Sequence, residues 1–179
     1  MLSDRELWEN FVSGDEEAFK VLYEKYLAVL IHYGNRFSKN EELVRDSVQD
    51  LFIDLYRYRT KLKKKTDKIQ PYLMVSLKRI LVRRLRKEGV LIYTGIEKLP
   101  YDYPLKEVES GWSYETEYDF LQEAIDRLTS RQREAIYLKY VSGLDYEDIS
   151  VILDINYQSA RNIIYRALQN LRETLLNQP

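Results

Sequence analysis

The sequence of 179 residues contains no cysteine, only six glycines and four prolines, and a single histidine. Without cysteine there are no disulfides, no thiolate metal ligands and no thiol nucleophile. The one histidine, His32, has no second histidine or cysteine with which to build a zinc site, so we interpret it as a packing residue. Because glycine and proline interrupt helices, their scarcity favours long helical segments.

Long hydrophobic runs are also missing. No run of about 18 apolar residues could span a bilayer, and the amino terminus lacks the charged start and apolar core of a signal peptide. No phosphate-binding loop of the GxxxxGK type occurs, and no carboxylate sits in a motif suggesting paired acid–base work. The sequence therefore predicts a protein that is not an enzyme, needs no cofactor or metal, does not insert into membranes and works in the reducing cytoplasm.

Positive charge is concentrated in one block, although the net charge of the whole chain is only −1. Residues 61–88 carry 11 basic and 2 acidic side chains, a net of +9, while residues 1–60 carry 8 and 12, a net of −4. Clustering of this kind, more than net charge, is the electrostatic footprint of phosphate binding. Alternatively, the basic cluster forms a solvated surface that keeps the protein soluble.

Apolar residues recur at three- and four-residue steps in four segments of the first half, the spacing of amphipathic helices. The expected helices are a short one capped by Ser3 and Glu6, one capped by Asp15 and reaching Phe37, one over residues 43–58, and one over residues 71–87. Residues 59–68, RTKLKKKTDK, are too charged to belong to a core.

The second half begins with a break in this spacing. Residues 89–114 hold three glycines and two prolines and have no sustained period, whereas helical spacing resumes near Tyr118 and continues to about Leu175. No segment matches a strand pattern equally well. The sequence therefore predicts an all-α protein of two small helical domains, residues 1–88 and 116–179, joined by a linker over residues 89–115.

Residues 145–168 have the pattern helix, three-residue turn, helix, with Asn156 as the cap of the second helix. In helix-turn-helix proteins the leading residues of that second helix face base edges in the major groove. Donors and acceptors suited to bases and phosphates gather there: Tyr157, Gln158, Ser159, Arg161, Asn162 and, one turn on, Arg166. The apolar residues Ile163, Ile164, Ala167 and Leu168 are expected to point away from them. Spacing alone leaves a plain helical hairpin as the alternative.

Residues 128–173 resemble region four of bacterial sigma factors. The resemblance rests on Gly143-Leu144, Tyr146–Ile149, Ile152-Leu153 and Arg166-Ala167 with Leu171, while Thr129 stands where the family usually has proline. Residues 14–30 and 44–59 resemble the opening helices of sigma region two, and residues 69–87 resemble the basic helix that follows. Two regions in this order are typical of the small extracytoplasmic-function (ECF) type of the sigma-70 family.

The resemblance implies a sigma factor that binds core RNA polymerase and directs promoter-specific transcription initiation in the cytoplasm. Region four would read the −35 element of promoter DNA through a helix-turn-helix without a wing, and region two would capture the opened −10 element. Core RNA polymerase and promoter DNA are then the partners, and the existence of an anti-sigma factor is left open. The linker is expected to thread a channel of the polymerase.

The resemblance also assigns residues of region two. Polymerase binding falls to the polar face of the second long helix, Asp46, Gln49, Asp50 and Asp54. Capture of the opened strand falls to Lys63, Lys64, Lys65, Tyr72, Lys78, Arg79, Arg83, Arg86 and Lys87. Arg79 and Arg83 stand where members commonly have asparagine and aspartate, which leaves the choice of −10 bases open.

Simpler interpretations accompany each assignment. The carboxylate face is also what a solvated helix would show, and Tyr56, Tyr58 and Tyr72, which border the basic block and could stack on bases, are equally suited to packing. A helix-turn-helix regulator that is not a polymerase subunit would explain residues 128–173 but leave the first half idle. A helical adaptor that binds only proteins would need no DNA affinity.

Overall fold

The computed structural model describes residues 2–62, 66, 68–89 and 115–176. The described residues form helices and no strand, which confirms the all-α class. The chain divides into two compact units, Met1–Tyr93 and Thr94–Pro179. Residues 90–114, most of the predicted linker, lie outside the described residues, as do Lys63, Lys64 and Lys65 of the predicted DNA surface.

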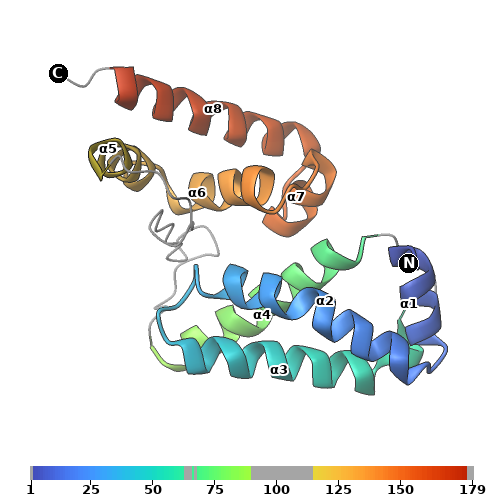
Figure 1. Ribbon diagram of the computed structural model, residues 1–179. Coiled ribbons are helices and arrows are strands. Elements are labelled where there is room, and N and C mark those ends of the chain that lie inside the picture. The colour runs from blue at the N-terminus through green and yellow to red at the C-terminus, as the bar shows by residue number, and fades with distance from the viewer. Residues whose placement is uncertain (1, 63–65, 67, 90–114, 177–179) are drawn as a thin grey trace. The chain divides into compact units, whose positions relative to one another are not determined.

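The described residues of the first unit form four α-helices and a short 3₁₀ turn: α1 (Asp4–Val12), α2 (Glu16–Gly34), α3 (Glu41–Arg57), η1 (Arg59–Lys61) and α4 (Ile69–Lys87). α2, α3 and α4 pack against one another, and α1 packs on α2 at one end of the unit (Figure 1). The centre of the core is apolar and inaccessible to water, with Leu22, Leu30, Tyr33, Val44, Leu73, Leu77 and Leu81. Burial of each such side chain contributes about 1.5–3 kcal/mol.

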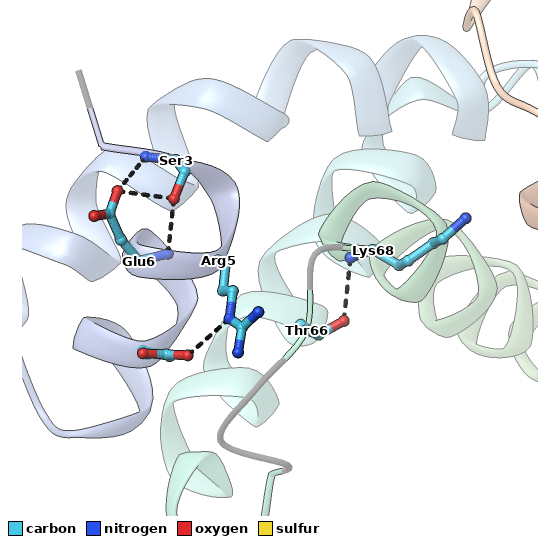
Figure 2. A network of polar contacts seen from close by, with 6 residues as sticks. Ser3, Arg5, Glu6, Thr66 and Lys68 are labelled. Atoms are coloured by element: carbon cyan, nitrogen blue, oxygen red, sulfur yellow. Dashed lines mark hydrogen bonds and ion pairs between the residues drawn. The ribbon is translucent and has the colours of Figure 1, made fainter.

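Side-chain caps fix where these helices begin. Ser3 Oγ accepts from the backbone N–H of Glu6 at 3.3 Å, and the Glu6 carboxylate accepts from Ser3 N at 2.8 Å, a complete capping box (Figure 2). The Asp15 carboxylate accepts from the backbone of Glu17 at 2.9 Å, and Asn40 caps α3. The caps predicted at Ser3 and Asp15 are therefore confirmed.

The predicted end of the second helix is wrong by three residues, because α2 ends at Gly34 instead of Phe37. Gly34 lies so close to α3 that a Cβ there would come within 2.6 Å of Val44 Cγ1. The chain turns immediately afterwards and returns the Phe37 ring to within 5.1 Å of Tyr33. Phe37 is buried, as its spacing predicts, but by a turn and not by a continued helix.

The second unit consists of α5 (Glu115–Asp126), α6 (Ser130–Ile136), the π-helical turn η4 (Tyr137–Val141), α7 (Tyr146–Leu153) and α8 (Tyr157–Leu176). α8 runs across α5, α6 and α7 and packs on all three (Figure 1). In η4 the Tyr137 carbonyl accepts from Ser142 N at 3.0 Å, five residues on. Nowhere in the described ranges is a helix both long and apolar enough to cross a membrane.

Candidate nucleic-acid and protein interfaces

A helix-turn-helix is built from α7, a three-residue turn and α8. The Asp145 carboxylate accepts from Asp148 N at 2.7 Å and so caps α7. Asp154 takes a left-handed conformation, with φ of 54°, which lets the chain reverse within three residues. Asn156 Oδ1 then accepts from Ser159 N at 2.8 Å and starts α8. The predicted motif and its cap are confirmed.

α8 has one buried side and one exposed side at its leading end. The buried side is formed by Ala160, Ile164 and Ala167. Five of the six predicted DNA-reading residues are exposed and one, Ser159, is half-buried: Tyr157, Gln158, Ser159, Arg161, Asn162 and Arg166. Leu168, expected to point toward the core, is 40% exposed, because the buried side follows positions 160, 164 and 167 and the next residue along the helix points away from that side.

The exposed side chains contact one another in pairs one helical turn apart. Gln158 Nε2 donates to Asn162 Oδ1 at 3.2 Å. The Arg161 guanidinium carbon lies 6.0 Å from the centre of the Tyr157 ring. Both pairs keep polar groups accessible to a ligand that approaches α8 from outside.

Two residues outside the predicted set support Tyr157. The Tyr146 ring meets the Tyr157 ring edge-to-face, with centroids 6.0 Å apart. The Lys139 ammonium lies 4.6 Å from the centre of the Tyr146 ring and donates to the Leu144 carbonyl at 3.2 Å. The only sequence signal for this contact is an aromatic residue at the start of each of two helices that share a tight turn.

The exposed cations of α4 form a stripe along one side of the helix. They are Arg79, Arg83, Arg86 and Lys87, spaced by three, four and seven residues. Tyr72 lies two turns before Arg79, is partly exposed, and meets the Trp8 ring of α1 edge-to-face at 5.5 Å. All five of these predicted residues are therefore exposed to solvent on α4.

The structure corrects the predicted DNA surface at Lys78, which is buried. Its side chain is only 6% exposed, and its ammonium lies 5.8 Å from the centre of the Phe37 ring. The physical reason is helical register, since Met74, four residues earlier, is fully buried. Lys78 therefore belongs with the core side of α4 and not with the stripe.

The tyrosines at the end of α3 divide between packing and exposure. Tyr56 is half-buried, and its ring centre lies 5.0 Å from that of Phe19 and 4.4 Å from the guanidinium carbon of Arg59. Tyr58 is exposed, with the Lys61 ammonium 5.4 Å from its ring centre. Only Tyr58 and Tyr72 therefore keep ring surface available for stacking on a base.

The predicted polymerase-binding residues share one face of α3. Asp46, Gln49 and Asp54 are exposed and Asp50 is half-buried. Arg84 of α4 approaches this face, with its Nη2 2.5 Å from Asp50 Oδ2 and its Nη1 3.9 Å from Asp46 Oδ2. The sequence gives a weak signal for this orientation, because Arg84 follows the buried Leu81 by three residues and Leu77 by seven.

An apolar side chain that was not predicted lies on the same face of α3. Ile53 is 46% exposed and follows Gln49 by four residues and Asp50 by three. An accessible apolar group surrounded by polar ones is the arrangement found at the centres of protein–protein interfaces.

Among the described residues, no group of three or more histidine, aspartate or glutamate side chains could hold a metal ion.

Two family profiles match most of the described chain. Sigma-70 region 2 matches residues 22–90, and Sigma-70, region 4 matches residues 120–171. The chain belongs to the sigma-70 family. It is a sigma factor of the ECF type, which binds core RNA polymerase and directs promoter-specific transcription initiation.

Named relatives cover nearly the full length of this sigma factor. It is 25% identical to the RNA polymerase sigma-H factor of Pseudomonas aeruginosa, over 96% of this chain and 93% of that protein. It is 22% identical to the ECF RNA polymerase sigma factor SigM of Bacillus subtilis, over 84% and 91%. It is 26% identical to the ECF RNA polymerase sigma-E factor of Escherichia coli, over 93% and 91%.

Solved structures support the fold. CnrH in complex with the cytosolic domain of CnrY matches with a TM-score of 0.66 and 19% identity, over 99% of this sigma factor and 100% of that chain. The sigma factor RpoE in complex with the anti-sigma factor NepR, from Bartonella quintana, matches with a TM-score of 0.62 and 22% identity, over 91% and 99%. At sequence identities of 19% and 22%, these similarities show a shared helical fold.

Proposed function

We propose that this sigma factor divides promoter recognition between three surfaces. The leading side of α8 reads the −35 element in duplex DNA. The exposed stripe of α4, with the basic segment before it, holds the opened −10 strand. The polar face of α3 binds core RNA polymerase. In this proposal residues 1–88 and 116–179 act as separate domains, and residues 89–115 connect them.

The observation that carries the proposal is the sidedness of α8. Its buried residues are apolar, while its exposed leading residues are donors and acceptors. Arg161 and Asn162 offer the guanidinium and amide groups that pair with guanine and adenine edges in a major groove. Arg166, one turn further, suits a phosphate contact that fixes the register of the helix.

Features of the first unit are evidence for the other two proposed surfaces, on α4 and α3. The stripe of α4 combines several cations with the exposed rings of Tyr58 and Tyr72, as single-strand binding requires. The carboxylates of α3 suit a basic partner surface, because complementary charge steers the encounter and fixes its orientation. We assign no catalytic step to the sigma factor itself, since the polymerase performs the chemistry.

Two further aspects follow by analogy with the relatives. Both solved relatives are held by another protein, named as an anti-sigma factor in one case, and we propose that an anti-sigma factor controls this chain as well. Since core polymerase works in the cytoplasm, we place the action of this sigma factor there.

The decisive test is transcription in vitro. Core RNA polymerase with the purified sigma factor is given a library of genomic fragments, and transcript 5′ ends are mapped. We expect discrete start sites that share two upstream motifs about two helical turns apart, which is roughly 70 Å. If wild-type protein binds core polymerase but yields no discrete starts, the proposal is wrong.

Variants assign the surfaces separately. The double change Asp46→Ala and Asp54→Ala should weaken binding to core polymerase and leave the sequence motifs of the remaining starts unchanged. Glu24→Ala, which removes an exposed carboxylate from α2, is the matched control and should bind like wild type. Equal effects of the two changes would contradict the assignment of α3.

The alternative is a helix-turn-helix regulator that is not a polymerase subunit. It is favoured only by the helix-turn-helix itself, which both classes share. A pull-down with core polymerase in the absence of DNA separates the two, because a regulator of that class would not be retained.

A further inference from the structure

We propose that Arg84 is a positioning residue that holds the polymerase-binding carboxylates of α3 in place before core polymerase docks. This inference rests on the proposed role of α3. It assigns one cation of the basic helix to protein binding instead of DNA binding. The observation behind it is the bridge from Arg84 to Asp50 and Asp46, which links the two helices that the proposal gives to different ligands.

Arg84 differs from the other arginines of α4 in where it points. Arg79, Arg83 and Arg86 are exposed, whereas the Arg84 side chain is 28% exposed and reaches toward α3. Its two terminal nitrogens approach two different carboxylates, at 2.5 Å and 3.9 Å. A planar guanidinium with several donors is suited to this arrangement, since it can contact the Asp46 and Asp50 carboxylates at once without moving the aliphatic part of the side chain.

The two carboxylates need such a partner. Asp46 and Asp50 are four residues apart on α3, where like charges face each other and destabilise a helix. Without Arg84 both side chains would repel and sample several rotamers. Arg84 holds Asp50 through Oδ2, and in this proposal the other carboxylate oxygen accepts from a donor of the partner. Ordering these groups in advance reduces the entropy lost when the partner binds.

A simple charge argument predicts the opposite effect. Removing Arg84 makes the face of α3 more negative and should strengthen its attraction to a basic surface. This attraction acts between largely exposed groups and is screened at physiological salt, where the Debye length is about 8 Å. We therefore expect the loss of order to dominate, and the sign of the effect decides between the two arguments.

The experiment measures the Kd of the full chain for core RNA polymerase without DNA, at physiological salt. Arg84→Gln should weaken binding about three- to tenfold, the effect of releasing one or two ordered side chains. Arg84→Lys should lie between, because an ammonium can hold one carboxylate but lacks the fork. The control is Arg5→Gln, which removes an arginine paired with Glu9 at 3.2 Å on α1 and should leave the Kd unchanged (Figure 2).

A double-mutant cycle separates positioning from a general structural role. In an Asp50→Asn, Asp46→Asn background, Arg84→Gln should change the Kd less than twofold, since there is no carboxylate left to position. Unfolding curves establish that each measured variant is folded. If Arg84→Gln does not fold, Arg84→Lys takes its place in the cycle. Equal or tighter binding by Arg84→Gln, or the same loss in both backgrounds, overturns the inference. Failure of the wild type to bind core polymerase would instead overturn the proposed function.

Discussion

At the residue scale, Asp4 joins the first helix to the second. Lys25 Nζ donates to Asp4 at 2.5 Å and Tyr26 Oη donates at 2.9 Å. Partial burial opposes ionisation of Asp4, but the hydrogen bonds from Lys25 and Tyr26 outweigh it and hold the pKa of the Asp4 carboxyl below its usual range. Burial, reinforced by Asp4, raises the pKa of the Tyr26 hydroxyl far above its ordinary value, so that it remains a donor.

Replacing Asp4 should expose this linkage as a pH effect. We expect Asp4→Asn to lower the free energy of unfolding of the first unit by about 1 kcal/mol at pH 7, after allowing for solvent exposure. A depressed folded-state pKa contributes stability above the unfolded value near 3.9, and this contribution is lost as the pH falls through the folded value. The difference between variant and wild type should therefore shrink below about pH 4.

Denaturant unfolding at pH 7 and pH 3 measures the effect. Trp8 is buried in α1 and reports on it by fluorescence in a Trp112→Phe background. Glu9→Gln, which removes the exposed pairing partner of Arg5, is the control and should change stability by less than about 0.5 kcal/mol. A deficit in Asp4→Asn that is as large at pH 3 as at pH 7 would rule out the ionic explanation.

Arg161 provides the residue-scale test of DNA reading. Arg161→Ala should weaken binding of the polymerase holoenzyme to its promoter, measured against an upstream element of scrambled sequence. If the guanidinium contacts a base edge, discrimination should fall by about 1–3 kcal/mol, whereas a phosphate contact would give a uniform loss and a smaller salt dependence. Unchanged affinity on both templates would remove Arg161 from the interface.

Individual cations show where prediction from sequence ends at this scale. Clustering of charge is a property of the sequence, so the basic block could be recognised. The direction of each side chain depends on helical register and on neighbours from other helices. Lys78 is buried against Phe37, and Arg84 turns to Asp50 of α3. Both contacts join segments distant in sequence, and the local spacing of apolar residues indicates the side of the helix but not the contact partner.

At the element scale, the helix starts marked by a capping side chain were predicted better than the end of α2. Ser3, Asp15 and Asn156 satisfy backbone donors within three residues of themselves, so the sequence alone determines these caps. α2 ends where Gly34 closely approaches α3, and apolar spacing gives no sign of the π turn of η4. Apolar periodicity does not distinguish a continued helix from a turn that buries the same side chain.

The close approach of α2 to α3 can be tested at Gly34. Gly34→Ala places a Cβ 2.6 Å from Val44 Cγ1, and the stiff, fully buried valine cannot move freely. We expect the change to destabilise the first unit by about 1–3 kcal/mol, as overpacking of cores does. Unfolding measurements that show Gly34→Ala to be neutral would contradict the predicted clash.

A compensating change makes this test specific. Val44→Ala removes the atom that clashes, so the double variant should lose less stability than the sum of the two single changes. Simple additivity would mean that the effect of Gly34→Ala arises elsewhere.

The cap of α8 allows structure and function to be compared. Asn156→Ala removes the acceptor of Ser159 N and should destabilise the second unit by about 1 kcal/mol, while Asn156→Ser keeps an acceptor and should be nearly neutral. Because the DNA-reading residues occupy the first turns of α8, promoter binding should fall in the alanine variant and persist in the serine variant. Circular dichroism melts and holoenzyme binding assays check the two readouts, and equal behaviour of both variants would count against the cap.

At the scale of the whole molecule, the distribution of charge is more informative than its sum. The net charge of −1 gives no hint of nucleic-acid binding, whereas residues 61–88 alone carry +9 and the segment that follows, residues 89–127, carries 3 basic and 9 acidic side chains. An acidic segment would avoid DNA and leave contact with it to the flanking parts. The sequence thus predicts which parts of the chain would meet phosphate, whereas the exposure of each side chain has to come from the structure.

The length of chain between the two matched regions sets a limit on their separation. About 27 residues, the predicted linker, can span at most roughly 90 Å at about 3.3 Å each, and promoter elements two helical turns apart are separated by roughly 70 Å. Deleting nine residues from it leaves a maximum of about 60 Å. We expect this deletion to abolish promoter-specific transcription while binding to core polymerase is retained, as measured by in vitro transcription and pull-down.

A replacement of equal length separates reach from sequence. If span alone matters, exchanging the same nine residues for a glycine–serine segment should preserve transcription, because the maximum extension is unchanged. If the acidic residues also occupy a channel of the polymerase, this replacement should reduce transcription without altering the position of the start sites. Full activity of the shortened chain would contradict both arguments, since one sigma factor would then engage two elements that its chain cannot span.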